Sequence, residues 1–115
     1  MQERRAHTRV ATPVMIEFPQ PGTMKTERSY TQDVSESGMR FPTAVRLDVG
    51  QEMPVVMRLP FDDGTLHATA IVVWVREISR IGPPQYEVGV RFRWIDDPDR
   101  HRLNHHLTAL FHRRA

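Results

Sequence analysis

The fold class is decided by one stretch near the C-terminus, Tyr86-Glu87-Val88-Gly89-Val90-Arg91-Phe92. Every second residue in it is apolar or aromatic, and glutamate, glycine and arginine fill the positions between. Successive side chains of a β-strand point to opposite faces, so this alternation indicates a strand with one buried and one polar face. We expect this strand to span about residues 85–93.

Five further strands are predicted upstream, separated by turns rich in glycine and proline. Such strands at roughly even spacing are typical of a small antiparallel barrel. The predicted fold is therefore all-β in the main, a six-stranded antiparallel β-barrel over residues 13–96. The five strands are expected at residues 14–18, 28–34, 39–43, 52–59 and 65–76.

Both ends of the chain differ from this pattern. Residues 1–12 are polar and basic without a clear period, and we expect a flexible N-terminal arm. Residues 97–115 are expected to form an α-helix, with Asp97 as its N-cap and Pro98 at its first position. This helix should close an open end or seam of the barrel with an apolar stripe of Leu103, Leu107, Leu110 and Phe111. Its solvated face should carry Arg100, Arg102 and His105.

Composition limits the classes of protein to consider. A chain of 115 residues fits one domain, and the absence of cysteine excludes disulfides and thiolate metal sites. The N-terminus has no apolar stretch of a secretory signal, and the longest apolar run, Ala70–Val75, is too short to span a bilayer. We therefore expect a cytoplasmic protein without membrane insertion.

Arginine dominates the basic residues, since Lys25 is the one lysine among 16 basic side chains. The planar guanidinium pairs bidentately with phosphate and stacks on flat rings. An arginine-favouring genome composition explains the bias equally well. The net charge of +2 is small for a general nucleic-acid binder.

Two segments carry candidate binding residues. Arg5 and Arg9 are four positions apart, so in a helical turn they share a face, and in a loop they can curl around one phosphodiester. Alternatively, they belong to a solubilising basic terminus. The second segment reads Asp33-Val34-Ser35-Glu36-Ser37-Gly38.

In this second segment, a carboxylate can accept hydrogen bonds from guanine N1–H and its exocyclic amine. A serine hydroxyl can donate to a phosphate or base, and Gly38 can let the backbone approach a ligand or adopt a positive φ. Read alone, the segment is also an ordinary turn sequence.

Together, the R-x-x-x-R pair, the D-x-S-x-x-G segment and the run of strands resemble the PilZ domain family over about residues 4–111. Domains of this family are six-stranded barrels that bind the bacterial second messenger cyclic di-GMP. The resemblance implies that Arg5 and Arg9 grip phosphate and guanine. It also implies that Asp33 and Ser35 contact a guanine while Gly38 permits close backbone approach.

Two more residues join the candidate site. Arg4 adds a third guanidinium, and family members with a long or charged residue there can hold a stacked ligand dimer, so one or two ligands per site remain open. Trp74 is a secondary candidate for packing against a purine; the alternative is a core tryptophan beneath the C-terminal helix. The predicted site is Arg4, Arg5, Arg9, Asp33, Ser35, Gly38 and Trp74.

Catalytic and metal sites are not supported. His101 and His105 have a zinc-compatible spacing, but no cysteine is present and the surrounding helix is rich in arginine. Ser35 and Ser37 lack a nucleophile elbow, and no phosphate-cradling glycine loop occurs. We therefore expect no enzyme, no metal and no cofactor.

The predicted function is a cyclic di-GMP receptor that orders its N-terminal arm on binding and signals to a protein partner that the sequence does not name. An alternative is a PilZ-like interaction module that works without nucleotide, for example in pilus or motility machinery. A third possibility is a barrel that binds single-stranded nucleic acid. It is disfavoured because aromatics make up 8% of the chain and do not interleave with basic residues. No DNA or RNA partner is expected.

Overall fold

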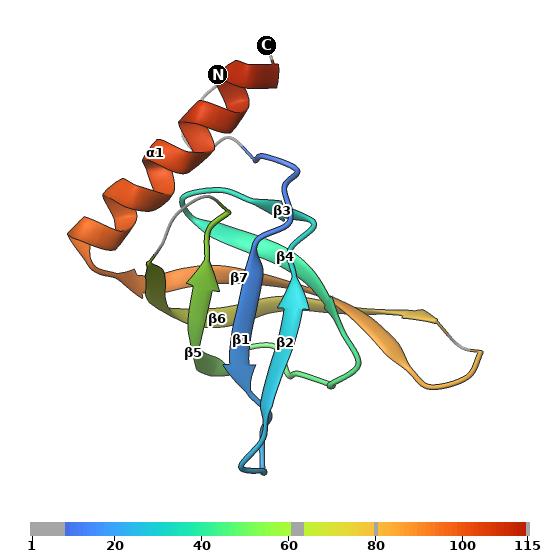
Figure 1. The fold of residues 1–115 in the computed structure, drawn as a ribbon. Helices are drawn as coiled ribbons and strands as arrows, with labels where there is room; N and C mark the ends of the chain where they lie inside the picture. The colour runs from blue at the N-terminus through green and yellow to red at the C-terminus, as the bar shows by residue number, and fades with distance from the viewer. Residues whose placement is uncertain (1–8, 61–63, 80, 115) are drawn as a thin grey trace.

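The computed structural model describes residues 9–60, 64–79 and 81–114, which form one seven-stranded antiparallel sheet and one helix. The strands lie side by side in the order β2-β1-β5-β6-β7-β4-β3. Figure 1 shows a strongly curled sheet with the helix across one end. The elements are β1 (Met15–Pro19), β2 (Thr26–Tyr30), β3 (Asp33–Val34), β4 (Gly38–Thr43), β5 (Glu52–Arg58), β6 (Thr65–Ser79), β7 (Gln85–Ile95) and α1 (Asp97–Arg114).

The sheet curls because its two edge strands are neighbours in the chain. β2 and β3 lie at opposite edges, yet only Thr31 and Gln32 separate them. The Thr31 N–H still donates to the Val14 carbonyl (3.0 Å), whereas the Gln32 N–H already donates to the Arg40 carbonyl of β4 (2.8 Å). The chain therefore crosses from one edge to the other here, which brings the edges together as in a barrel. The single strand predicted over residues 28–34 is thus two strands, and the sheet has seven in place of six.

The core lies inside the curl and is built from alternate residues of the strands. In β1, Ile16 and Phe18 point inward between more exposed neighbours. The Phe18 ring packs on Phe41 of β4 with a centroid separation of 5.4 Å and a tilt of 47°. Each such fully buried side chain contributes about 1.5–3 kcal/mol relative to an exposed one.

β7 departs from the predicted half-buried strand, because it is buried on both faces from Tyr86 to Val90. Glu87, expected on a polar face, is 4% exposed and is covered by arginines of β4 and β6. Gly89 lies against the Trp74 indole, since an added Cβ would stand 2.2 Å from its Nε1. Side chains of β4 and β6 cover the face of β7 that carries Glu87 and Gly89. The alternation of residues within β7 alone does not predict this cover.

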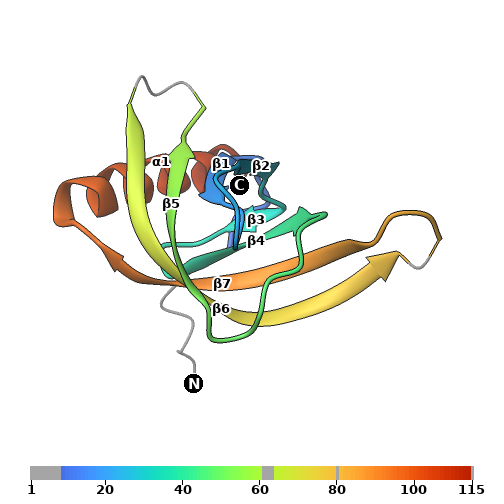
Figure 2. The same cartoon turned by 90° about the horizontal axis from the view of Figure 1, so that it is seen from below.

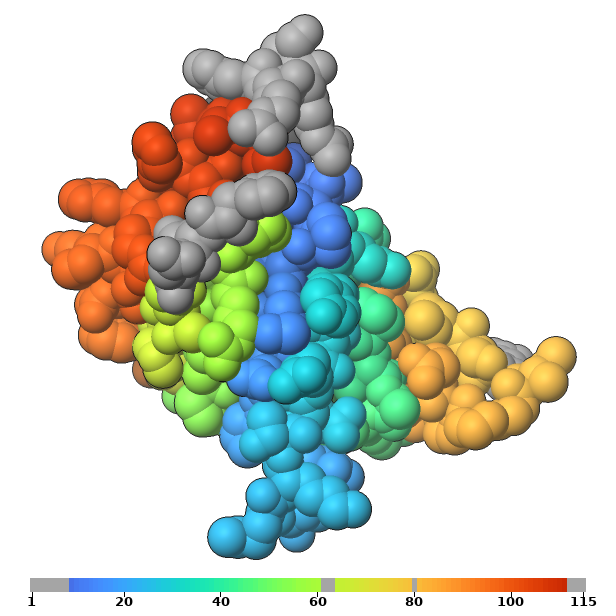
Figure 3. All heavy atoms as spheres, viewed as in Figure 1, coloured from blue at the N-terminus to red at the C-terminus, as the bar shows by residue number. Residues whose placement is uncertain are grey.

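β6 and β7 form a long hairpin that projects beyond the barrel (Figures 1 and 2). In the space-filling view, its outer part stands clear of the main body (Figure 3). The register shifts between Val72 and Trp74, which places Trp74 opposite Gly89. A bulge adds a residue to one strand and re-aims the side chains that follow.

The segment before β1 is attached to β3. Val10 and Val34 form an antiparallel bridge in which each N–H donates to the other's carbonyl, at 2.8 and 2.9 Å. Val10 is buried, and so is Thr12. Residues 9–12, which the sequence grouped with the arm, therefore pack on the sheet. Residues 1–8 of the predicted arm lie outside the described residues.

The start of α1 differs from the predicted cap. Asp96, and not Asp97, has the N-cap role, because its Oδ1 accepts a hydrogen bond from the Asp99 N–H at 3.1 Å. The Asp96 carbonyl accepts the first helical bond from the Arg100 N–H (2.9 Å). Pro98 consequently lies one position further into the helix than predicted.

The apolar stripe of α1 packs on the barrel for most of its length. Leu103 and Leu107 are buried and Leu110 is partly buried against the core, whereas Phe111 remains 49% exposed. Arg102, predicted on the solvated face, donates from Nη1 to the Thr65 carbonyl of β6 (3.1 Å). Among the described residues, no helix combines the length and apolar character required to cross a bilayer.

Candidate functional site

The two sequence motifs meet at Asp33. Arg9 Nη1 donates to Asp33 Oδ1 at 2.7 Å, which joins the second arginine of R-x-x-x-R to the acid of D-x-S-x-x-G. The Val10–Val34 bridge holds the Arg9 backbone beside β3 and so sets up this contact. Asp33 is 8% exposed, while the Arg9 side chain remains 60% exposed.

Arg4 and Arg5, the remaining predicted residues of the first motif, lie outside the described residues. Their contacts are therefore not part of the geometry below.

Arg40 belongs to the site, although the sequence analysis missed it. Its Nη2 lies 2.7 Å from Asp33 Oδ2, so each oxygen of the Asp33 carboxylate faces a different arginine. Arg40 stands directly opposite Asp33 in the β3–β4 register. Opposite residues of an antiparallel pair share a face, so reading residues 33–43 as a hairpin would have found it.

The ion pairs continue across β7 to β6. Arg40 Nε lies 3.7 Å from Oε2 of Glu87, and Oε1 of Glu87 accepts a short hydrogen bond from Arg76 Nη2. A buried carboxylate requires paired charges, and the two arginines supply them. We call this set the charged row, and it consists of Arg9, Asp33, Arg40, Glu87 and Arg76.

Trp74 lies on the same face of the sheet as the charged row, at the end of a line of cross-strand neighbours that starts at Asp33. In register, Trp74 pairs with Gly89, Gly89 with Arg40, and Arg40 with Asp33. Trp74 is 37% exposed, so it is not the core tryptophan beneath α1 that was the alternative. A glycine inside a strand marks close approach of another group, and Gly89 was therefore a readable signal for this contact.

Ser35 shapes the turn between β3 and β4. Its N–H donates to the Gly38 carbonyl (2.8 Å), and its Oγ accepts from the Ser37 N–H (3.2 Å). The hydroxyl also lies 3.0 Å from Ser37 Oγ. Ser35 is buried and supports the turn that carries Asp33.

Gly38 is required by packing between strands. Of the two alternatives given for Gly38, close backbone approach or a positive φ, the second is not observed, because the described glycines with positive φ are Gly22, Gly50 and Gly82. A Cβ on Gly38 would instead stand 2.2 Å from the Val90 carbonyl oxygen of β7. The glycine thus permits a close backbone approach, but to another strand.

This face carries the Asp33 carboxylate, several guanidiniums and the partly exposed Trp74 indole. Guanidiniums bind phosphate, a carboxylate accepts from the N–H edge of a base, and an indole stacks on a planar ring. The combination suits a ligand with phosphates and a purine. Within residues 9–60, 64–79 and 81–114, no group of three or more acidic or histidine side chains is placed to hold a metal ion.

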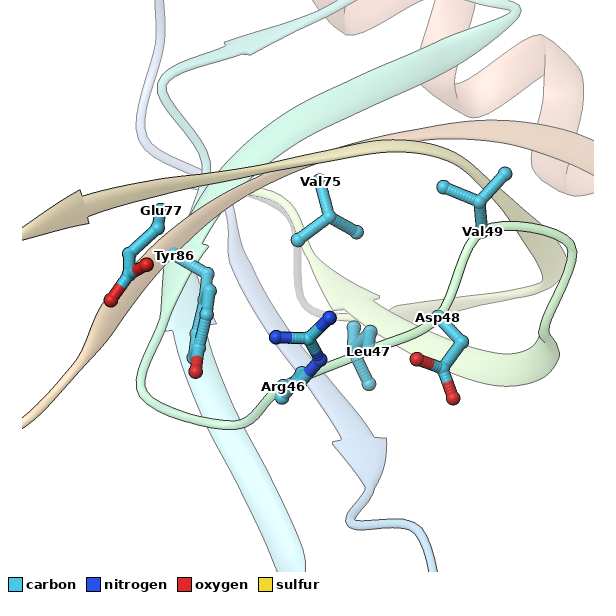
Figure 4. A pocket seen from close by; sticks show the side chains of 7 residues that line it. All are labelled: Arg46, Leu47, Asp48, Val49, Val75, Glu77 and Tyr86. Atoms are coloured by element: carbon cyan, nitrogen blue, oxygen red, sulfur yellow. The ribbon is translucent and has the colours of Figure 1, made fainter.

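A hollow lies on the opposite face of the β6–β7 hairpin from the charged row. Val75 and Glu77 alternate along β6 with Trp74 and Arg76, so they point away from the charged row. The hollow has a volume of about 340 Å³, and in Figure 4 the Arg46 side chain lies between Tyr86 and Leu47. Its lining residues, of mixed charge, are Arg46, Leu47, Asp48, Val49, Val75, Glu77 and Tyr86.

Comparison with solved structures shows the same fold. The inhibitor of motility MotI/DgrA of Bacillus subtilis gives a TM-score of 0.77 at 15% identity, over 98% of this chain and 52% of that one. The PilZ domain of Escherichia coli YcgR with c-di-GMP gives 0.73 at 18%, over 96% and 94%. The K. pneumonia MrkH–c-di-GMP complex gives 0.76 at 17%, over 96% and 53%. This chain therefore spans about half the length of MotI and MrkH.

A comparison with curated proteins found no match. The model of the PilZ domain, in contrast, matches residues 3–109, which is nearly the whole chain. Because the match includes both motifs that meet at Asp33 and every strand of the sheet, this chain belongs to the PilZ domain family.

Proposed function

We propose that this protein is a receptor for cyclic di-GMP, bound on the face that carries Asp33, Arg9 and Trp74. The observation that carries the proposal is the 2.7 Å contact between Arg9 and Asp33, which joins the family's two motifs in one place. Two structural neighbours of 17–18% identity, YcgR and MrkH, are described as complexes with c-di-GMP. That likeness concerns the fold, so the ligand of this chain is inferred from its own residues.

Each residue of the site has a proposed role. Arg5 and Arg9 bind phosphate and a guanine edge, because guanidiniums suit both acceptor sets. The Asp33 carboxylate accepts from guanine N1–H and the exocyclic amine, and the Ser35 hydroxyl contacts the same guanine. Arg4 adds a third guanidinium, which a second, stacked ligand would require.

Signalling is the second part of the proposal. The N-terminal arm orders over the ligand, and the surface so formed is recognised by a protein partner in the cytoplasm. Neither catalysis nor a cofactor enters this scheme. Because the ligand is proposed to bind on one face of the barrel, the N-terminal arm is the part of the chain whose conformation would change on binding.

Calorimetric titration of cyclic di-GMP into the wild-type protein, with GTP as the control ligand, tests the receptor proposal. We expect micromolar or tighter binding of the dinucleotide and none of GTP, and the molar ratio gives one ligand or two per site. A folded protein that releases no heat at high ligand concentration would contradict the proposal. The nucleotide-independent interaction module would then be the better description.

Trp74 should supply stacking energy to this binding. Trp74→Leu is expected to weaken cyclic di-GMP binding about tenfold, because base–aromatic stacking contributes about 1–3 kcal/mol per base. Trp94→Leu is the matched control, since Trp94 is also an exposed tryptophan but pairs with Thr69, away from the charged row. Equal losses in the two variants, measured by the same titration, would place the ligand elsewhere.

A further inference from the structure

Arg40 stands between two carboxylates and satisfies only one of them. Its Nη2 lies 2.7 Å from Asp33 Oδ2, but its Nε is 3.7 Å from Glu87 Oε2, too far for a hydrogen bond. That Nε is buried and has no hydrogen-bond partner among the described residues. A buried donor without an acceptor is unfavourable, so this position of Arg40 is a compromise.

Both oxygens of the Asp33 carboxylate are paired with arginines in this structure. Arg9 occupies Oδ1 and Arg40 occupies Oδ2, both at 2.7 Å. A guanine edge that donates two parallel hydrogen bonds needs both oxygens of a carboxylate at once. Arg9 and Arg40 therefore compete with guanine for Asp33, the residue proposed to bind the guanine edge.

Glu87 offers Arg40 an alternative partner. Its carboxylate is buried, and its Oε1 is held by Arg76, which fixes the orientation of the group. Its Oε2 faces the unpaired Nε of Arg40. A shift of less than about 1 Å would bring this pair to hydrogen-bond distance and give the Nε its missing acceptor.

We propose that Arg40 is a latch on the ligand site, and this rests on the proposed function. Before cyclic di-GMP binds, Arg40 is paired with Asp33. When a guanine of the ligand forms hydrogen bonds to the Asp33 carboxylate, Arg40 moves to pair with Glu87. Arg40 thus sets the affinity as a competitor of the ligand. Glu87 is a positioning residue, which acts only through Arg40.

A double-mutant cycle tests the latch by calorimetric titration of cyclic di-GMP. Arg40→Met removes one of the two arginines that compete with guanine for Asp33, and it is expected to tighten binding about threefold to tenfold. Glu87→Gln removes the charged alternative and is expected to weaken binding about tenfold in the wild-type background. In the Arg40→Met background, Glu87→Gln should change affinity less than about twofold, since the residue it acts through is gone.

Two results of the cycle would overturn the latch. Weaker binding by Arg40→Met would show that Arg40 contacts the ligand directly and does not compete with it. An equal loss from Glu87→Gln in both backgrounds would show that Glu87 acts without Arg40. Circular dichroism and thermal unfolding confirm that each variant is folded before titration.

A ligand-free measurement separates this proposal from the receptor proposal. Asp33→Asn removes the charge that holds Arg40, so Arg40 should move to Glu87 without any nucleotide. The Nε–H signal of Arg40 in nitrogen-15 NMR, identified by its loss in Arg40→Met, should then exchange with water at least about tenfold more slowly. An unchanged exchange rate would refute the latch even if cyclic di-GMP binds. Slower exchange would support the transfer of Arg40 to Glu87, and a failed titration of the wild type would then contradict the receptor proposal and not this transfer.

Discussion

Asp33→Asn should weaken cyclic di-GMP binding at least a hundredfold. Asparagine keeps the shape of the side chain but replaces one acceptor oxygen with a donor amide, which then faces a donor of the guanine edge. Hydrogen bonds to a charged group contribute about 1.5–3 kcal/mol each, and the site would lose the charge from two of them. Calorimetric titration of wild type and variant under one salt condition measures the change.

Asp48→Asn is the matched control for this variant. It removes the same charge by the same substitution, but Asp48 lines the hollow on the opposite face of the hairpin. We expect the affinity of this variant for cyclic di-GMP to stay within about twofold of the wild type. Asp48 is exposed, and salt screens the interaction of an exposed charge with a ligand on the opposite face. If Asp33→Asn binds as tightly as Asp48→Asn, the ligand does not use the carboxylate where the two motifs meet.

The sequence was most informative where a pattern is local. The alternation in residues 86–92 predicted β7, and its observed range of Gln85–Ile95 confirms the strand with small changes at the ends. Glycine and proline turns predicted where the other strands lie along the chain, except that residues 28–34 form parts of two strands. The two motifs, far apart in the chain, were expected to act together. The structure brings Arg9 of the first motif to Asp33 of the second, and their joint binding of a ligand stays a prediction.

Residues defined by register are not visible in the pattern of a single strand, although reading residues 33–43 as a hairpin would have paired Arg40 with Asp33. Arg40 and Glu87 read as ordinary charged residues of amphipathic strands, and their importance arises only when β3, β4 and β7 are aligned. Trp74 faces Gly89 only because a bulge shifts β6 by one residue. A slip of one residue reverses which face a side chain occupies, so such contacts require the paired sheet.

Hydrogen bonds at the ends of helices and strands are a second kind of feature that the sequence pattern could not assign. Asp96 and Asp97 are adjacent and chemically identical, and only the bond to the Asp99 N–H assigns the cap to Asp96. Likewise, residues 28–34 have the composition of one strand. Thr31 and Gln32 divide it because their N–H groups donate to opposite edges of the sheet.

Gly38→Ala is expected to lower the free energy of unfolding by about 3 kcal/mol, the largest effect on stability that we predict. The added Cβ would stand 2.2 Å from the Val90 carbonyl oxygen and 3.2 Å from Arg91 Cα. These are backbone atoms of β7, which cannot rotate away as a side chain would, so β4 and β7 must separate. Urea-induced unfolding followed by tryptophan fluorescence measures the loss.

Gly22→Ala is the control that separates packing from backbone conformation. Gly22 has a φ of +75° with nothing within 4 Å of an added Cβ, so its substitution tests conformational strain alone, about 1 kcal/mol. Gly38 has the reverse combination, an ordinary φ and no space. If Gly38→Ala lowers the free energy of unfolding no more than Gly22→Ala does, the strands tolerate the methyl group. Gly38 would then be needed only for approach of the ligand. A loss near 3 kcal/mol would instead mean that this motif residue serves the fold first, by letting β4 lie close enough to β7 to place Arg40 beside Glu87.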